Sequence, residues 1–213
     1  MERFERFVDA LKKAAAAELP GWQAQQQMAP AQRMKPETWA EYYQNARLGA
    51  VLILFYPHNG GVLTVFIQRP TYEGVHSGQV AFPGGKKEDD DADLIQTALR
   101  EAWEEVGIKP EQVEVIRPLS ELYIPPSNFL VTPVMGISYE RPSFVPQLTE
   151  VAEILEIDIQ LLSDPAIAAT RRIVIREGIE VDSPSFDIGG RIIWGATAMM
   201  ISELNAVLKK VEW

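Results

Sequence analysis

Residues 83–108 constrain this chain more than any other segment. They open with a Pro-Gly-Gly turn, carry five acidic residues within positions 88–93, and end in Arg-Glu-Ala-Trp-Glu-Glu-Val-Gly-Ile. Asp91 and Asp93 favour a helix start, and Gly107 followed by Ile108 favours a helix end. Between them, apolar residues recur at helical spacing and predict one buried stripe: Leu94, Ile95, Ala98, Leu99, Ala102 and Val106. The segment is therefore predicted to be an acidic loop followed by a helix.

The acidic residues of this helix predict a metal site. Glu101, Glu104 and Glu105 are related as i, i+3 and i+4, so they share one helix face, and Arg100 can pair with Glu104. Carboxylates crowded on one face repel each other unless a cation lies among them. Mg²⁺ and Mn²⁺ prefer such oxygen ligands together with substrate phosphates. The alternative is a solvated acidic face on a surface helix.

The same segment resembles the Nudix box, conventionally Gly-x5-Glu-x7-Arg-Glu-U-x-Glu-Glu-x-Gly-U, where U is a bulky apolar residue. Its second half is matched by Arg100, Glu101, Glu104, Glu105, Gly107 and Ile108. Counting from Gly85 places Asp91 at the first acidic position, with eight residues before Arg100, so Asp91 or Glu88 takes that role. The resemblance implies metal ligation by Glu101, Glu104, Glu105 and Gly85, with Arg100 orienting Glu104.

A second stretch resembles the coenzyme A diphosphatase branch of that family. Gly78 and residues 82–85 fit the Gly-x3-Phe-Pro-Gly-Gly pattern, whereas Gly74 stands where the branch has arginine. Residues 129–134, 150–153 and 193–198 are also similar, and the likeness covers about residues 48–210. It implies Mg²⁺- or Mn²⁺-dependent hydrolysis of coenzyme A to 3′,5′-ADP and 4′-phosphopantetheine. The alternatives are hydrolysis of ADP-ribose or another nucleotide sugar, and a Nudix-fold binding module without turnover.

Further candidate site residues lie outside the box. Family members often take another glutamate from a later loop, as ligand or general base, and Glu150 is the first candidate, with Glu153 second. Arg69 and Lys86 are expected to contact substrate phosphates. Tyr123 is expected to stack on a base beside the Pro-Pro-Ser-Asn loop at 125–128.

Composition excludes several other classes of protein. The chain has no cysteine and only two histidines, which disfavours disulfides and zinc. A net charge of −10 argues against nucleic acid as a partner, since a phosphate backbone requires a basic surface. No apolar run is long enough to span a membrane, and the N-terminus predicts an amphipathic helix rather than a signal peptide. We therefore expect a cytoplasmic protein that acts on a small nucleotide.

The order of predicted elements indicates an α/β fold. Residues 1–46 are expected to form a helix (2–17) and an irregular extension that packs on the domain or joins a homodimer contact. Residues 47–213 are expected to form one Nudix-like α/β/α sandwich around a mixed sheet. The predicted strands are 51–56, 62–68, 113–117, 120–123, 129–137, 151–157, 172–175 and 186–194, with a short helix near 161 and a final helix over 196–210.

Overall fold

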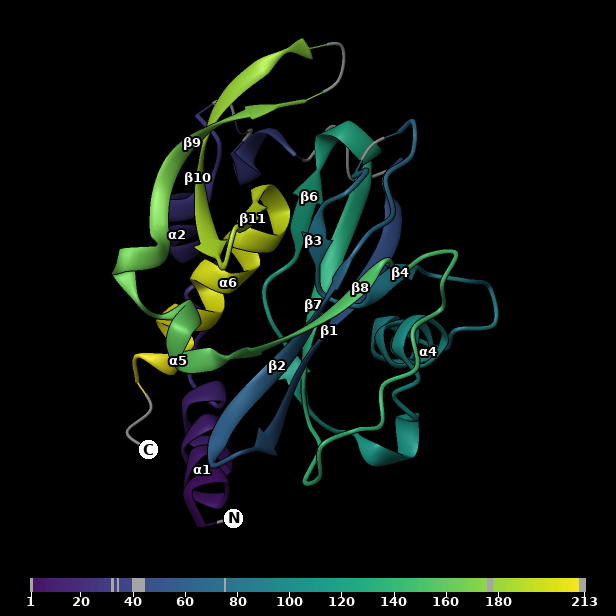
Figure 1. The fold of residues 1–213 in the computed structure, drawn as a ribbon, viewed down its shortest axis with the longest axis vertical. Helices are drawn as coiled ribbons and strands as arrows, with labels where there is room; N and C mark the ends of the chain where they lie inside the picture. Colours follow the sequence, from purple (N-terminus) through teal and green to yellow (C-terminus); the bar gives the residue numbers. More distant parts are fainter. Residues whose placement is uncertain are drawn as a thin grey trace.

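A computed structural model describes residues 2–31, 33, 35–39, 45–74, 76–175 and 178–210. Its centre is a mixed eight-stranded sheet in which β1 and β7 run parallel and the other pairs are antiparallel (Figure 1). The strands are β1 (Arg47–His58), β2 (Gly61–Gln68), β3 (Val80–Ala81), β4 (Gly84–Lys86), β5 (Glu114–Pro118), β6 (Leu122–Ile124), β7 (Phe129–Ile137) and β8 (Glu153–Asp158).

The long strand β1 is shared by two neighbours along one edge. Its C-terminal part pairs with β2, through a hairpin whose turn residues Asn59 and Gly60 have positive φ angles of 48° and 79°. Its N-terminal part pairs with β4, where Val51 lies opposite Gly84 and Ala50 opposite Gly85. The divided edge therefore places the predicted glycine turn inside the sheet, next to the helix that follows it.

Helices cover both faces of the sheet, which confirms the predicted sandwich. Helix α4 (Leu94–Val106) packs Ala98 and Ala102 against Leu52 and Leu54 of β1. On the opposite face, α1 (Glu2–Ala15) and α6 (Gly195–Leu208) pack into one core with Ile53, Phe55 and Phe66. Figure 1 shows α4 on the right of the sheet and α1 and α6 on its left. The split follows from strand alternation, since successive residues of β1 point to opposite faces.

The extension before β1 joins this core through a buried carboxylate. Helix α2 (Gly21–Gln25) lies against α6, and Glu203 of α6 is fully buried. Its oxygens accept hydrogen bonds from the Gln25 side chain at 2.8 Å, the Gly21 amide at 3.1 Å and the Ser120 amide at 3.3 Å. Short 3₁₀ turns follow at Gln26–Met28 and Pro36–Thr38. The rest of the predicted extension, at 32, 34 and 40–44, lies outside the described residues.

A second, three-stranded sheet was predicted only as a hairpin. It consists of β9 (Ala168–Val174), β10 (Glu180–Ile188) and β11 (Arg191–Trp194) in the order β11-β10-β9. The predicted single strand 186–194 is wrong, because Gly189 and Gly190 have φ angles of 61° and 87° and turn the chain between β10 and β11. Strand β11 lies against β3 and leads directly into α6 (Figure 1).

The remaining elements are short. Helix α5 (Ile159–Leu162) follows β8, and 3₁₀ turns occur at Pro110–Gln112, Pro125–Ser127 and Pro165–Ile167. In the part of the chain that the structure describes, no helix has the length and apolar character needed to cross a membrane.

Candidate active site

Helix α4 begins and ends where its sequence predicts. The Asp93 side chain caps the first turn by accepting a hydrogen bond from the Gln96 amide at 2.8 Å. Gly107 ends the helix at φ 77°, and the amide of Ile108 bonds back to the Ala102 carbonyl at 3.2 Å. Ile108 is buried beside Val106. Both ends are thus fixed, which sets the rotation of the helix and the direction of its glutamates.

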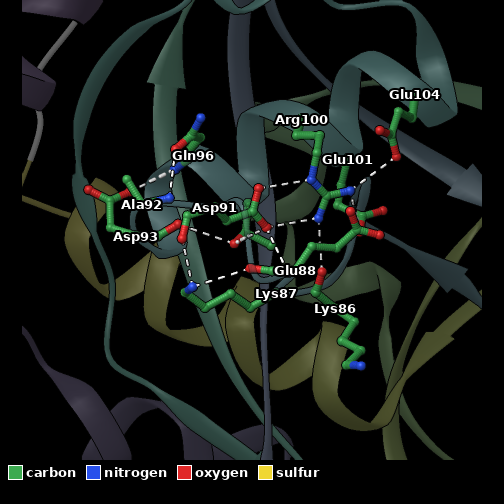
Figure 2. Close-up of polar contacts among 11 residues, drawn as sticks. Lys86, Lys87, Glu88, Asp91, Ala92, Asp93, Gln96, Arg100, Glu101 and Glu104 are labelled. Atoms are coloured by element: carbon green, nitrogen blue, oxygen red, sulfur yellow. Dashed lines mark hydrogen bonds and ion pairs between the residues drawn. The ribbon is translucent and has the colours of Figure 1, made fainter.

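Asp91, one of the two candidates for the first acidic position, anchors Arg100. The Arg100 guanidinium donates two hydrogen bonds of 2.9 Å to Asp91, and the Thr97 hydroxyl and Glu88 amide donate two more (Figure 2). Asp91 is only 4% exposed. These hydrogen bonds, that of Arg100 above all, hold the pKa of Asp91 well below its ordinary value. The longer acidic loop is therefore tied to the helix by a carboxylate that stays charged.

Arg100 also contacts the helix glutamates. Its Nη1 atom lies 3.1 Å from one oxygen of Glu101 and 3.1 Å from one oxygen of Glu104, and its Nη2 donates to the Lys86 carbonyl at 2.9 Å (Figure 2). Arg100 thus orients Glu104, as predicted, but Asp91 is the partner that holds the guanidinium in place. The side chain of Glu104 remains 56% exposed.

Glu105 is buried against the glycine turn. It is 2% exposed, and its Oε2 accepts a hydrogen bond of 2.7 Å from the Gly84 amide. Burial raises the pKa of Glu105 to about 7, against the lowering effects of Arg69 and the Gly84 amide. The negative charges of Glu101 and Glu150 add to the increase. Glu105 is therefore a desolvated carboxylate in a negative environment.

Glu101 lies one turn before Glu105 and packs against Gly85. A Cβ atom on Gly85 would lie 2.5 Å from the Glu101 carboxyl carbon, so a side chain there would displace the Glu101 carboxylate. Burial raises the pKa of Glu101, Arg100 opposes the shift, and the charges of Glu104 and Glu150 reinforce it. The predicted grouping of Gly85 with Glu101 and Glu105 is thus present in the structure.

A distant loop brings Glu150 to the same side. The amides of Val145 and Gln147 bond to the carbonyls of Val106 and Glu105 at 3.0 and 2.9 Å, so residues 145–147 occupy the C-terminal end of α4. The Glu150 amide then closes a turn on the Gln147 carbonyl at 2.9 Å. The exposed Glu150 carries the charge that acts on both Glu101 and Glu105.

Glu153 is held elsewhere. It lies opposite Gln68 on β8, and both of its carboxylate oxygens accept hydrogen bonds from Arg191 of β11. The sequence contains no local signal for this ion pair, because Glu153 and Arg191 are distant in the chain and belong to different sheets. Of the two later glutamates, Glu150 is therefore the one that the fold brings to the helix carboxylates.

The predicted substrate residues separate into two groups. The Arg69 guanidinium lies 3.4 Å from the Gly84 carbonyl and 4.0 Å from Glu105, and Lys86 is an exposed residue at the end of β4. Tyr123 is only 3% exposed: its ring packs near Trp39 and its hydroxyl donates to Asn128 at 2.9 Å. The packing around β6 thus leaves no face of the ring open to a base. Tyr123 is a core residue, and the predicted stacking role does not fit its burial.

The donor types fit a hard divalent cation. Glu105 is buried and Glu101 half-buried, and their adjacent carboxylates repel each other, a situation that a cation relieves. Among the side chains that the structure describes, no three His, Cys, Asp or Glu residues are gathered closely enough to hold a metal. Glu101 and Glu105 therefore form a donor pair, and further ligands have to come from Glu104 or Glu150, which lie at the surface.

Fold and carboxylate helix together define a Nudix domain. The family model for the NUDIX domain matches residues 46–170, more than half of the chain, and the protein belongs to this family. The uncharacterised Nudix hydrolase NudL of Pectobacterium atrosepticum is 40% identical over 134 residues, which cover 61% of this chain and 66% of NudL.

Two further comparisons extend beyond the matched domain. Nudix hydrolase 15, mitochondrial, of Arabidopsis thaliana is 30% identical over 170 residues, covering 78% of this chain and 59% of that protein. The chain thus spans less than two thirds of the length of these two relatives. The crystal structure of RenU, a Nudix hydrolase from M. smegmatis, has a TM-score of 0.53 at 20% identity and covers 79% of this chain and 89% of RenU. That likeness concerns the fold.

Proposed function

We propose that this protein is a metal-dependent hydrolase that cleaves the diphosphate linkage of a nucleoside diphosphate joined to a second group. The observation that carries the proposal is the contact of Glu101 with Gly85 and of Glu105 with Gly84, within the field of the Glu150 charge. Membership of the Nudix family supports it. In a purely structural helix, a buried Glu105 beside a half-buried, repelling Glu101 would only add a cost of desolvation.

Each residue has a distinct part in the proposed reaction. When bound, Mg²⁺ or Mn²⁺ neutralises phosphate charge, orients the linkage and makes bound water more acidic. Glu101 and Glu105 would hold the cation, and the exposed Glu104 would complete its ligands. Glu150 accepts the proton of the attacking water. The water oxygen bonds to phosphorus, the bridging P–O bond breaks, and two phosphate monoesters leave.

Two cations are placed to receive the phosphates. Arg69 approaches the Gly84 carbonyl from one side of the turn, and Lys86 follows the turn on β4. Arg69 also offsets part of the negative charge around Glu105. A substrate that brings two phosphates to this turn therefore meets positive charge there, although the chain as a whole carries a net charge of −10.

Coenzyme A is the leading substrate in this proposal. The support is the resemblance of residues 77–85 to the coenzyme A diphosphatase branch, with Gly74 at the position of the expected arginine. Cleavage would give 3′,5′-ADP and 4′-phosphopantetheine. ADP-ribose and other nucleotide sugars are the alternative substrates within the same chemistry, and a binding module without turnover is the alternative class.

A hydrolysis panel tests the proposal. Coenzyme A, dephospho-coenzyme A and ADP-ribose are incubated at equal concentration with Mg²⁺, Mn²⁺ or EDTA, and the products are identified by mass. We expect coenzyme A to be cut within its diphosphate and EDTA to abolish the reaction. Much faster cleavage of ADP-ribose would reject coenzyme A as the substrate but would still support a hydrolase. Binding of these compounds without any cleavage would establish the binding module instead.

A further inference from the structure

A cavity of about 330 Å³ lies between the loop that precedes the glycine turn and the three-stranded sheet. Its lining includes Gln68, Ser77, Gln79, Val174, Arg191 and Trp194. Gln68 ends β2, and the next residue, Arg69, reaches Gly84 and Glu105. Since successive residues of a strand point to opposite faces, the cavity and the carboxylates lie on either side of the same strand end.

The polar residues of the cavity are held in fixed orientations. The amide nitrogen of Gln68 donates to the Gly78 carbonyl, the amide oxygen of Gln79 bonds with the His76 ring, and the Ser77 hydroxyl accepts from the Tyr72 amide at 2.9 Å. These bonds leave the carbonyl end of Gln68 and the NH₂ end of Gln79 with the capacity for another partner. An acceptor and a donor of this kind match the edge of a heterocyclic base.

Strand β11 supplies an aromatic ring and a cation to the same cavity. Trp194 is the last residue of β11 and lies half-buried in the wall, and Arg191 is fixed by its ion pair with Glu153. At the cavity edge, Val174 adds an apolar side chain that is 65% exposed. Flat rings stack on tryptophan irrespective of base identity.

The cavity is within reach of the proposed reaction centre. Val80 lines it, and Gly84 follows Val80 by only four positions. A fully extended chain covers at most about 14 Å over that length, and β11 lies against β3 at the start of this stretch (Figure 1). A group attached to a diphosphate at Gly84 would therefore pass around the end of β2 to enter the cavity, over a Cα–Cα span of at most about 14 Å.

We propose that this cavity is a base-binding subsite, in which the nucleobase of the substrate stacks on Trp194 and is read by Gln68 and Gln79. The inference rests on the proposed function, which supplies a nucleotide at the neighbouring turn. A flexible chain of methylene and amide groups does not require an aromatic wall or paired side-chain amides. The base, rather than the other half of the substrate, is therefore the group that this lining fits.

Calorimetric binding without metal tests the subsite directly. AMP, GMP, CMP and UMP are compared with ribose 5-phosphate, which lacks the base, in EDTA. We expect at least one nucleotide to bind wild-type protein more than 10-fold tighter than ribose 5-phosphate. Trp194→Leu should weaken that nucleotide by about 5- to 150-fold, the range that base–aromatic stacking contributes, and Trp194→Phe should retain most of the affinity. Trp103→Leu, on the exposed face of α4, is the matched control.

Two outcomes would overturn the subsite. One is equal affinity for all four nucleotides and ribose 5-phosphate; the other is unchanged nucleotide binding in a folded Trp194→Leu protein. Saturation-transfer NMR on wild-type protein gives a test that needs no variant, with stronger saturation expected at base protons than at ribose protons. Equal saturation at both would also reject the proposal.

Turnover separates this inference from the proposed function. If Glu105→Gln abolishes hydrolysis but Trp194→Leu does not change nucleotide binding, the proposed hydrolase is supported and the subsite is rejected. Trp194-dependent nucleotide binding in a protein that hydrolyses none of the panel would keep the subsite and reject the hydrolase. In an active enzyme, we expect Trp194→Leu to raise KM by a larger factor than it lowers kcat.

Discussion

The carboxylate of Glu101 occupies the space that a side chain on Gly85 would fill. A Cβ atom on Gly85 would lie 2.5 Å from the Glu101 carboxyl carbon. Any side chain at this position of β4 would therefore push the Glu101 carboxylate of α4 aside. The contact joins β4 to α4 beside Glu105, the other glutamate of the pair proposed to bind metal.

Gly85→Ala should displace Glu101 and lower kcat by about 10²-fold, the loss expected when a reacting group is misplaced by about 1 Å. The protein should remain folded, because Glu101 is partly exposed and can turn away. Gly60→Ala is the matched control: it also changes a glycine, in a turn with open space around it, and should affect stability but not kcat. Equal activity of Gly85→Ala and wild type would contradict the placement of Glu101 at the site.

Glu105→Gln should lower kcat by about 10³-fold or more, because a metal donor is worth several kcal/mol of transition-state stabilisation. Its Tm in EDTA should equal or exceed that of wild type, since a neutral amide is cheaper to bury and its oxygen can still accept from Gly84. Steady-state kinetics and thermal unfolding measure the two effects. Glu111→Gln, exposed beyond the end of α4, is the control, and near-normal turnover in Glu105→Gln would remove this helix as the metal site.

Glu150→Gln should lower kcat by about 10²–10⁴-fold, the contribution of a placed general base, with little change in metal affinity. Glu153→Gln should have a smaller effect on kcat, because its carboxylate is bound to Arg191. Kinetics across a range of metal concentrations decide between them. A large loss in Glu153→Gln with a mild one in Glu150→Gln would move the role to Glu153; mild losses in both would show that neither accepts the proton.

Asp91→Asn should destabilise the fold by about 1.5–3 kcal/mol, the usual worth of hydrogen bonds to a charged group. Because the folded-state pKa of Asp91 is lowered, chiefly by Arg100, its contribution is complete above the unfolded pKa of about 4 and is lost as pH falls through the folded value. Urea unfolding should therefore show a constant difference from wild type between pH 6 and 8 that shrinks below about pH 4. Asp90→Asn, an exposed neighbour, should show no such difference; a difference that disappears near neutral pH would contradict the assignment.

Glu203→Ala should destabilise by about 1–3 kcal/mol, because it removes the acceptor of the Gly21 and Ser120 amides and leaves the Gln25 side chain only its bond to the Ser120 carbonyl. Glu203→Gln should cost less, since it retains one accepting oxygen. Chemical unfolding of the full chain measures both. Equal stability of Glu203→Ala and wild type would show that α2 is not anchored through this carboxylate.

Local patterns predicted most of the fold. The stripe on α4, its cap at Asp93 and its end at Gly107 depend on neighbouring residues, so sequence spacing was sufficient to place them. The Asn59-Gly60 hairpin and strand β7 follow for the same reason. The turn at Gly189-Gly190 was also a local signal, and reading it would have divided the predicted strand 186–194 correctly.

Long-range contacts explain what the sequence alone did not predict. Arg191 and Glu153, which form an ion pair, are 38 residues apart, and no spacing rule links them. Tyr123 lies between Leu122 and Ile124 in a short apolar run that suits either a core or a cleft, and only the packing of Trp39 against it decides for the core. Trp194 was overlooked as a site residue because its neighbour in the cavity, the loop at 77–80, is more than a hundred positions earlier.

The loop that carries Glu150 is attached to α4 through main-chain atoms, from the amides of Val145 and Gln147 to the carbonyls of Val106 and Glu105. Any residue except proline offers the same amide. Side chains at these two positions can therefore diverge during evolution, or be randomised in a library, without detaching the loop. Proline at 145 or 147 is the one substitution expected to detach the loop, because proline lacks the amide hydrogen that bonds to α4.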